Sequence, residues 1–206
     1  MPIQSVERKL AAIFAADIEG YSRLMGRDEV GTLDRLKAYR TIIDGLIAGR
    51  RGRIFNTAGD SVIADFPSAV EAVQCAVAVQ DAIGKENADR RSGEPMLFRI
   101  GIHVGDVIVE GDNLFGDAVN IAARLEALAE PGGVCVLGTV QDQIRDKLPH
   151  ALEDMGEQQV KNIARPVRVY SVNLAASKAS PPTGIASDAG GLATPDRFPP
   201  VREPVK

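Results

Sequence analysis

The chain has 206 residues, of which 45% are hydrophobic and 25% charged, and its 24 basic and 28 acidic residues give a net charge of −4. This composition is typical of a globular chain, and it excludes a collagen-like chain, a disulfide scaffold and a fully disordered chain. The charge balance gives no reason to expect nucleic acid or an anionic membrane as a partner. Because there is neither a membrane-length apolar run nor a signal-peptide layout, the sequence predicts a cytoplasmic location.

Apolar periodicity predicts alternating strands and helices in the first half of the chain. In order, these are a strand at Arg8–Ile18, the start of a helix at Tyr21–Met25, a helix at Glu29–Ala48, a hairpin of strands Arg53–Asn56 and Ser61–Phe66, and a helix from Pro67 to about Lys85. Thr57–Asp60 is expected to form the hairpin turn. Pro67 is expected in the first turn of its helix, where proline is tolerated.

The second half continues the alternation. The predicted elements are a strand at Met96–Val109 with a break at Gly105, a helix at Asp117–Glu130, a strand at Val134–Leu137, a helix at Thr139–Leu148, and closing strands at Gln159–Val160 and Val167–Val172. This order predicts an α/β (α+β) sandwich, with a mainly antiparallel, ferredoxin-like sheet covered by helices.

The composition changes near the end of the chain. Residues 180–206 contain six of the twelve prolines, separated mostly by small residues. Such a segment cannot bury enough apolar surface to offset its ordering entropy. We therefore expect a folded domain over 5–175, followed by a Pro/Gly/Ala-rich disordered tail or linker over 176–206.

Two aspartates stand where a metal could bind. Asp17 ends the first strand and Asp60 lies in the hairpin turn, and a ferredoxin-like sheet places these positions side by side. Paired carboxylates would suit Mg²⁺ or Mn²⁺, and backbone N–H groups at Gly20 and Tyr21 could cradle phosphate oxygens. The simpler interpretation is that one aspartate is a helix cap and the other a turn residue.

A second polar pair lies on the helix predicted after Gly116. Asn120 and Arg124 are four residues apart, so they share one face of that helix. An amide and a guanidinium together suit a ribose and a phosphate. The alternative is an ordinary solvated helix flank.

Five segments together carry a resemblance to a known family. They read FAADIEGYS from Phe14, NTAGDS from Asn56, RIGIHVG from Arg99, FGDAVNIAARL from Phe115 and VKN from Val160. In this order and spacing, the chain resembles the class III nucleotidyl cyclase catalytic domain, the adenylate and guanylate cyclase fold, in its soluble bacterial type. The resemblance covers residues 8–172.

The resemblance implies an adenylate cyclase that makes cyclic AMP and pyrophosphate from ATP, in a head-to-tail homodimer with two sites. It implies that Asp17, Asp60 and the carbonyl of Ile18 bind two divalent cations. It further implies that Arg99 and Lys161 hold the triphosphate, that Asn120 positions the ribose, and that Arg124 stabilises the transition state. Asp17 and Asp60 would come from one subunit, and Asn120 and Arg124 from the other.

The base-reading positions depart from the family pattern. Adenylate-specific members carry a Lys and an Asp where this chain has Asn56 and Asn113. An amide both donates and accepts hydrogen bonds, so the pair is compatible with adenine, with guanine, or with poor reading of both. Three alternatives therefore stay open: an ATP cyclase, a relaxed ATP/GTP cyclase, and a weak or silent nucleotide-binding regulatory dimer module.

Overall fold

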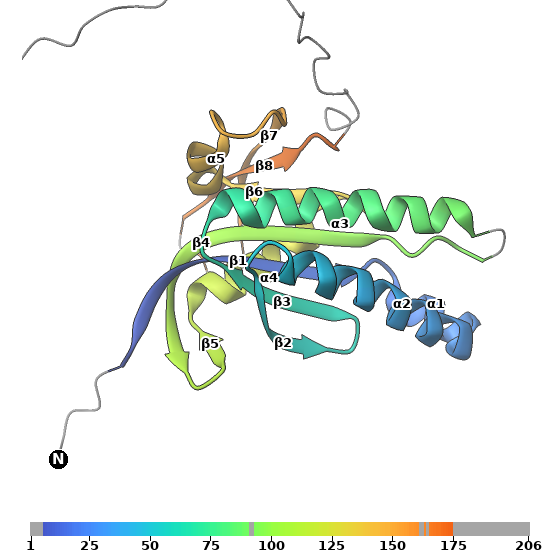
Figure 1. Ribbon diagram of the computed structural model, residues 1–206. Coiled ribbons are helices and arrows are strands. Elements are labelled where there is room, and N and C mark those ends of the chain that lie inside the picture. Colours follow the sequence, from blue (N-terminus) through green and yellow to red (C-terminus); the bar gives the residue numbers. More distant parts are fainter. Residues whose placement is uncertain (1–5, 91–92, 161–162, 164, 175–206) are drawn as a thin grey trace, which may run out of the picture.

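The computed structural model describes residues 6–90, 93–160, 163 and 165–174 (Figure 1). Its strands form one eight-stranded sheet in the order β2-β3-β1-β4-β6-β8-β7, with β5 paired to β4. Every pairing is antiparallel except β4 with β6. The strands are β1 (Arg8–Ile18), β2 (Arg53–Ala58), β3 (Ser61–Phe66), β4 (Phe98–Glu110), β5 (Asn113–Phe115), β6 (Val134–Leu137), β7 (Leu152–Gln158) and β8 (Val167–Val172).

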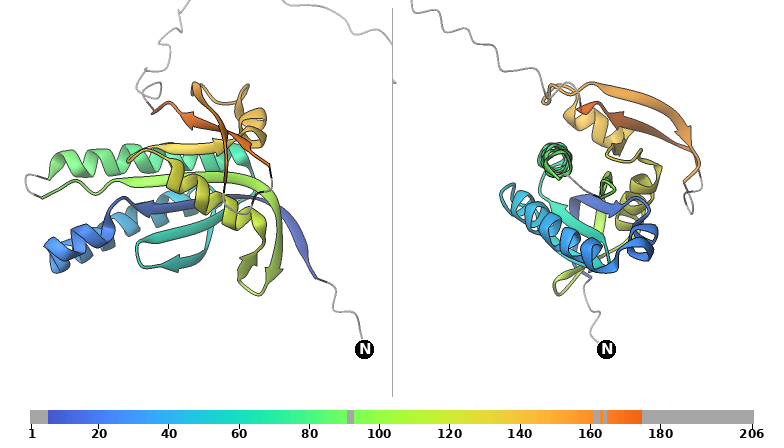
Figure 2. Two further views of the ribbon diagram at one scale, coloured as in Figure 1. Left: turned by 180° about the vertical axis from the view of Figure 1, so that it is seen from behind. Right: turned by 90° about the vertical axis from the view of Figure 1, so that its right-hand side faces the viewer.

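Helices cover both faces of the sheet, as the two views of Figure 2 show. They are α1 (Tyr21–Arg27), α2 (Glu29–Ala48), α3 (Ala69–Asp89), α4 (Asp117–Leu128) and α5 (Gly138–Ile144). Buried residues of α2, α3 and α5 form the main core on one face, whereas α4 packs on the other face. None of the described helices has the length and apolarity needed to cross a bilayer. The predicted α/β sandwich with a mainly antiparallel sheet is confirmed.

The central strand β1 serves both cores because its side chains alternate between the two faces. Phe14 and its even-numbered neighbours lie in the main core, whereas Ile13 and its odd-numbered neighbours pack towards α4. By this alternation Asp17 falls on the α4 face. The strand therefore carries one carboxylate to its end, on the side where α4 crosses the sheet.

Local capping explains where the long helices begin. The Asp28 carboxylate accepts a hydrogen bond from the Gly31 N–H at 2.9 Å, and the Ser68 hydroxyl accepts one from the Val70 N–H at 3.2 Å. Both are standard N-cap contacts. Because Ser68 is the cap, Pro67 precedes the helix, and the prediction that it occupies the first helical turn is wrong.

Four other sequence predictions need correction. The hairpin turn is Gly59–Asp60 rather than Thr57–Asp60, because Thr57 and Ala58 still pair with Val62 and Ser61 in β2. The seventh strand is Leu152–Gln158, not Gln159–Val160, and it pairs with β8. The fourth strand has no break at Gly105, which pairs with Ala11. The fifth helix ends at Ile144, four residues before the predicted end. Residues 175–206 lie outside the described part, so the domain boundary and the tail stay predictions.

Candidate active site

The two predicted metal-binding aspartates come together at one end of the sheet. Asp17 is the second-last residue of β1, and Asp60 lies in the tight turn between β2 and β3, where Gly59 adopts φ +60°. The backbone N–H of Ile18 donates a hydrogen bond to Asp60 Oδ2 at 3.0 Å. This bond fixes the hairpin turn to the end of β1, next to Asp17.

Arg99 is the direct cross-strand neighbour of Asp17, from strand β4. Its Nη2 donates to Asp17 Oδ1 at 3.0 Å and to Oδ2 at 3.2 Å, and its Nε lies 3.3 Å from Oδ1. Forked guanidinium–carboxylate contacts of this kind are strong and fix orientation. In this structure Arg99 therefore neutralises Asp17.

Glu126 completes this cluster, and the sequence analysis missed it. It lies on α4, is only 7% exposed, and its Oε1 lies 3.4 Å from Arg99 Nη2. Burial, reinforced by hydrogen bonding to and repulsion from Asp17, raises the pKa of Glu126 to about 9. In the sequence, Glu126 stands out only as an acidic residue on the apolar face of the helix, four positions after Ala122. That spacing does not show that Glu126 lies next to Asp17 and Arg99.

Gly101 explains how α4 comes close enough to place Glu126 there. A Cβ on this β4 residue would lie 2.2 Å from the Ala122 carbonyl oxygen and 2.2 Å from the Glu126 backbone nitrogen. No side chain fits in that space, so the helix backbone rests directly on the strand. Glycine at this position thus brings Glu126 to Arg99, two residues earlier on β4.

Asn120 and Arg124 lie on the opposite side of α4. Glu126 follows Arg124 by two residues, which is about 200° around a helix, whereas Asn120 and Arg124 share a face. Asn120 is exposed and Arg124 half-buried. Within the described ranges, the structure records no hydrogen bond or ion pair for either side chain. One chain therefore does not bring these two residues to Asp17 and Asp60.

The two base-reading candidates are both exposed, at neighbouring edges of the molecule. Asn56 is in β2 at a bulge, where the ladder to β3 shifts between Ile54 and Asn56. Asn113 is the first residue of β5, the short strand that pairs with the end of β4. Strands β2 and β5 are in contact. Lys161, predicted to hold the triphosphate, lies outside the described residues.

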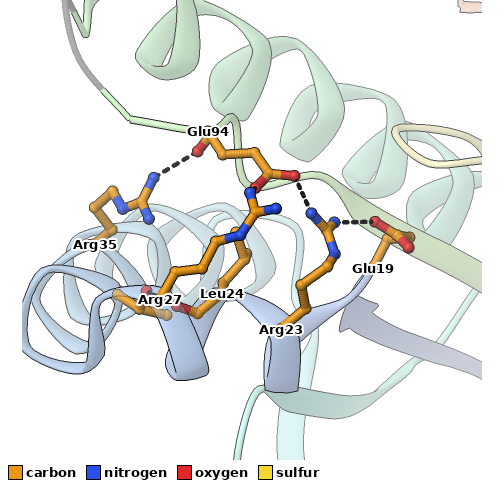
Figure 3. A network of polar contacts seen from close by, with 7 residues as sticks. Glu19, Arg23, Leu24, Arg27, Arg35 and Glu94 are labelled. Atoms are coloured by element: carbon orange, nitrogen blue, oxygen red, sulfur yellow. Dashed lines mark hydrogen bonds and ion pairs between the residues drawn. The ribbon is translucent and has the colours of Figure 1, made fainter.

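The segment after Ile18 is held by a polar network (Figure 3). Gly20, at φ +66°, precedes α1, and the Glu94 carboxylate binds Arg23 and Arg27 of this helix. The Glu94 carbonyl accepts a hydrogen bond from Arg35 of α2 at 2.6 Å. The Arg23 bond lowers the pKa of Glu94. This network ties α1, next to the paired aspartates, to the segment that enters β4.

The donor set at Asp17 and Asp60 fits a divalent cation that is shared with a substrate. Among the described residues there is no group of three or more His, Cys, Asp and Glu side chains that could hold a metal alone. Mg²⁺ in proteins commonly binds one or two carboxylates together with substrate phosphates. In addition, the buried Oε1 of Glu126 has no hydrogen-bond partner in the described structure. The carboxylates of Asp17 and Asp60, the main-chain carbonyl of Ile18 and the oxygens of a bound triphosphate would together make a donor set for a divalent cation.

Comparison with known proteins identifies the family of this chain. The sequence pattern of the adenylate and guanylate cyclase catalytic domain matches residues 3–173. A putative adenylate cyclase 3 from Rhizobium meliloti is 43% identical over 172 residues, which is 83% of this chain and 29% of the relative. An adenylate cyclase from Streptomyces coelicolor is 34% identical, over 65% of this chain and 33% of the relative. The chain thus spans about a third of the length of these curated relatives.

Solved structures give the same result. An adenylate/guanylate cyclase/hydrolase from Silicibacter pomeroyi superposes with a TM-score of 0.76 at 46% identity, covering 82% of this chain and 98% of that one. The adenylyl cyclase CyaB from P. aeruginosa superposes with a TM-score of 0.74 at 26% identity, covering 82% and 96%. From the family match and these likenesses, the chain belongs to the adenylate and guanylate cyclase catalytic-domain family.

Proposed function

We propose that this chain is an adenylate cyclase that converts ATP to 3′,5′-cyclic AMP and pyrophosphate, at two sites shared between the subunits of a head-to-tail homodimer. The observation that carries the proposal is the two-sided arrangement of α4. Asp17 and Asp60 lie by its Glu126 face, while Asn120 and Arg124 lie on the other face. Two copies related by a two-fold axis can complete two equivalent sites. Each site would take Asp17 and Asp60 from one copy and Asn120 and Arg124 from the other.

The proposed roles follow from the chemistry of the side chains. Asp17, Asp60 and the Ile18 carbonyl would hold Mg²⁺ or Mn²⁺ ions, which when bound lower the pKa of the ribose 3′-hydroxyl and neutralise the triphosphate. The reaction forms a bond from the 3′-oxygen to the α-phosphorus and breaks the bond to pyrophosphate, in line. Positioning and charge stabilisation therefore supply most of the rate enhancement.

The remaining residues bind and orient the nucleotide. Asn120 orients the ribose, and Arg124 stabilises the charge that develops on the equatorial phosphate oxygens. Arg99 and Lys161 hold the triphosphate, since a guanidinium fork suits a phosphate as well as it suits a carboxylate. The backbone N–H groups of Gly20 and Tyr21 cradle phosphate oxygens.

Asn56 and Asn113 contact the base. ATP is the favoured substrate because the Rhizobium and Streptomyces relatives carry adenylate cyclase names. The exposed position of both amides leaves them accessible to a nucleotide.

The test is a turnover assay with ATP and GTP supplied separately, each with Mg²⁺ and with Mn²⁺, measuring cyclic nucleotide and pyrophosphate. Asp17→Ala and Arg124→Ala should each abolish activity. Mixing the two should restore about a quarter of the wild-type rate, because half of the dimers are mixed and each mixed dimer keeps one of two sites. Mixing Asp17→Ala with Asp60→Ala is the control and should restore nothing, because both residues come from the same half of a site.

Two results would change the conclusion. Activity without rescue, with both variants folded, would refute the shared sites. Nucleotide binding with no product from ATP or GTP, at protein concentrations that saturate the dimer, would favour the silent regulatory dimer module instead.

A further inference from the structure

An ion-pair cluster joins β2, the strand that carries Asn56, to β3 and β1. Arg53, at the start of β2, is the cross-strand neighbour of Asp65 on β3. Its Nε donates to Asp65 Oδ1 at 3.1 Å, and Lys9 of β1 binds Asp65 Oδ2 at 2.6 Å. Asp65 is only 7% exposed. A buried carboxylate with two cationic partners holds the Arg53 side chain in one direction.

The same guanidinium reaches across to the hairpin that carries Asn113. Arg53 Nη1 donates to the Asp112 carbonyl oxygen at 2.7 Å. Asp112 and Gly111 form the two-residue turn between β4 and β5, and Gly111 takes φ +59° there. Arg53 thus fixes the peptide unit that leads into Asn113.

A bulge in β2 brings Asn56 onto the same side as Arg53. Residues three apart in a regular strand face opposite sides. Here Phe55 is an extra residue in the ladder, so Asn56 pairs with Ile63 while Arg53 pairs with Asp65. Ile63 packs in the core under α4 and β5. Both Arg53 and Asn56 therefore face the side on which β5 lies.

We propose that Arg53 is a positioning residue for nucleotide selectivity, because it ties the start of β2 to the turn before Asn113 and so sets how the two asparagines face a base. This inference rests on the proposed function, in which Asn56 and Asn113 contact that base. Arg53 itself does not touch the nucleotide. Its effect comes from the spacing of the two amides, which one charge-assisted hydrogen bond maintains.

The conservative variant Arg53→Lys separates this role from a merely structural one. A lysine ammonium is a single point charge, so it can keep the pair with Asp65 but cannot also reach the Asp112 carbonyl. Arg53→Gln removes both contacts. Asp65 is unsuitable for the test because its loss would leave Lys9 and Arg53 without their shared partner.

Arg51→Gln is the matched control. Arg51 is two residues upstream and binds Glu71 of α3 through an exposed ion pair, away from β5. The substitution removes one arginine charge two residues away, but it leaves the Arg53 bridge intact.

The measurement is competition of ATP and of GTP against a fluorescent ATP analogue on the full chain, in parallel with KM and kcat for each nucleotide and with thermal unfolding. Both Arg53 variants should change the ATP-to-GTP affinity ratio about tenfold, the effect of one hydrogen bond to a charged group. Arg53→Lys should keep the wild-type melting temperature, KM should change more than kcat, and Arg51→Gln should match the wild type.

Each other outcome counts against the inference. An unchanged affinity ratio in both Arg53 variants refutes it while leaving the nucleotide site in place. An equal loss for ATP and GTP that follows a lowered melting temperature assigns Arg53 a structural role only. Absence of nucleotide binding in the wild type refutes the proposed function, and the inference with it.

Discussion

Replacing Gly101 with alanine tests the packing that brings α4 onto β4. The added Cβ would lie 2.2 Å from two backbone atoms of α4, and neither belongs to a flexible side chain. Non-bonded heavy atoms are ordinarily about 3.5 Å apart, so the helix must move away from the strand by roughly 1 Å. Overpacking of this kind costs about 1–3 kcal/mol, and rigid backbone neighbours place Gly101→Ala at the upper end. For a domain of this size, 3 kcal/mol lowers the melting temperature by roughly 6–12 °C.

The same shift should also lower the turnover rate of the protein that remains folded. A misplacement of about 1 Å can cost about a hundredfold in rate, and α4 carries Asn120 and Arg124, the residues proposed to act on the ribose and the phosphate. The assay is thermal unfolding by circular dichroism, followed by cyclic nucleotide production below the melting temperature.

Gly84→Ala is the control for Gly101→Ala. Gly84 is an exposed residue inside α3 with nothing within 4 Å of its added Cβ. Alanine should stabilise this helix by about 0.5–1 kcal/mol. Equal melting temperatures for Gly101→Ala and the wild type would refute the close contact between α4 and β4.

Three further predictions concern buried and capping groups. Burial raises the pKa of Glu126 to about 9 from its ordinary value of 4.5, so the folded state loses stability as pH rises between these values. Glu126→Gln should therefore raise the melting temperature more at pH 8 than at pH 5 in metal-free buffer. An equal effect at both pH values would contradict the raised pKa. Burial raises the pKa of both free thiols, Cys75 and Cys135, to about 11. A thiol reagent should therefore label neither cysteine at pH 8 until denaturant unfolds the chain. Rapid labelling of the native protein would disprove their burial. Ser68→Ala removes the cap of α3 and should cost about 1 kcal/mol in chemical denaturation, while Ser68→Asp should retain the cap and most of the stability.

Elements with clear periodicity could be predicted to the residue. The strand Arg8–Ile18 and the helix Glu29–Ala48 match the structure, because a central strand is apolar on both faces and a long helix repeats its buried positions. The edge strand Leu152–Gln158 was missed for the opposite reason. It is rich in acidic residues, and Gly156, at φ +76°, lies where its ladder to β8 shifts.

The site could be predicted only where local sequence carries it. The proximity of Asp17 and Asp60 could be predicted from their positions at strand ends, because the topology brings their strands together. Glu126 was missed because its importance depends on Asp17 and Arg99, which are distant in sequence. The Arg53 bridge to Asp112 was missed likewise, since its acceptor is a backbone carbonyl, which residue identity does not reveal.

The two faces of α4 have a consequence for how two sites would communicate. In the proposed dimer, this one helix contributes Asn120 and Arg124 to one site while Glu126 borders the paired aspartates of the other. Binding that displaces Arg99 from Asp17 at one site acts on a helix that also lines the second. We therefore expect allosteric coupling, measurable as unequal first and second nucleotide dissociation constants in the dimer. Equal and independent dissociation constants for the two sites would contradict coupling through α4.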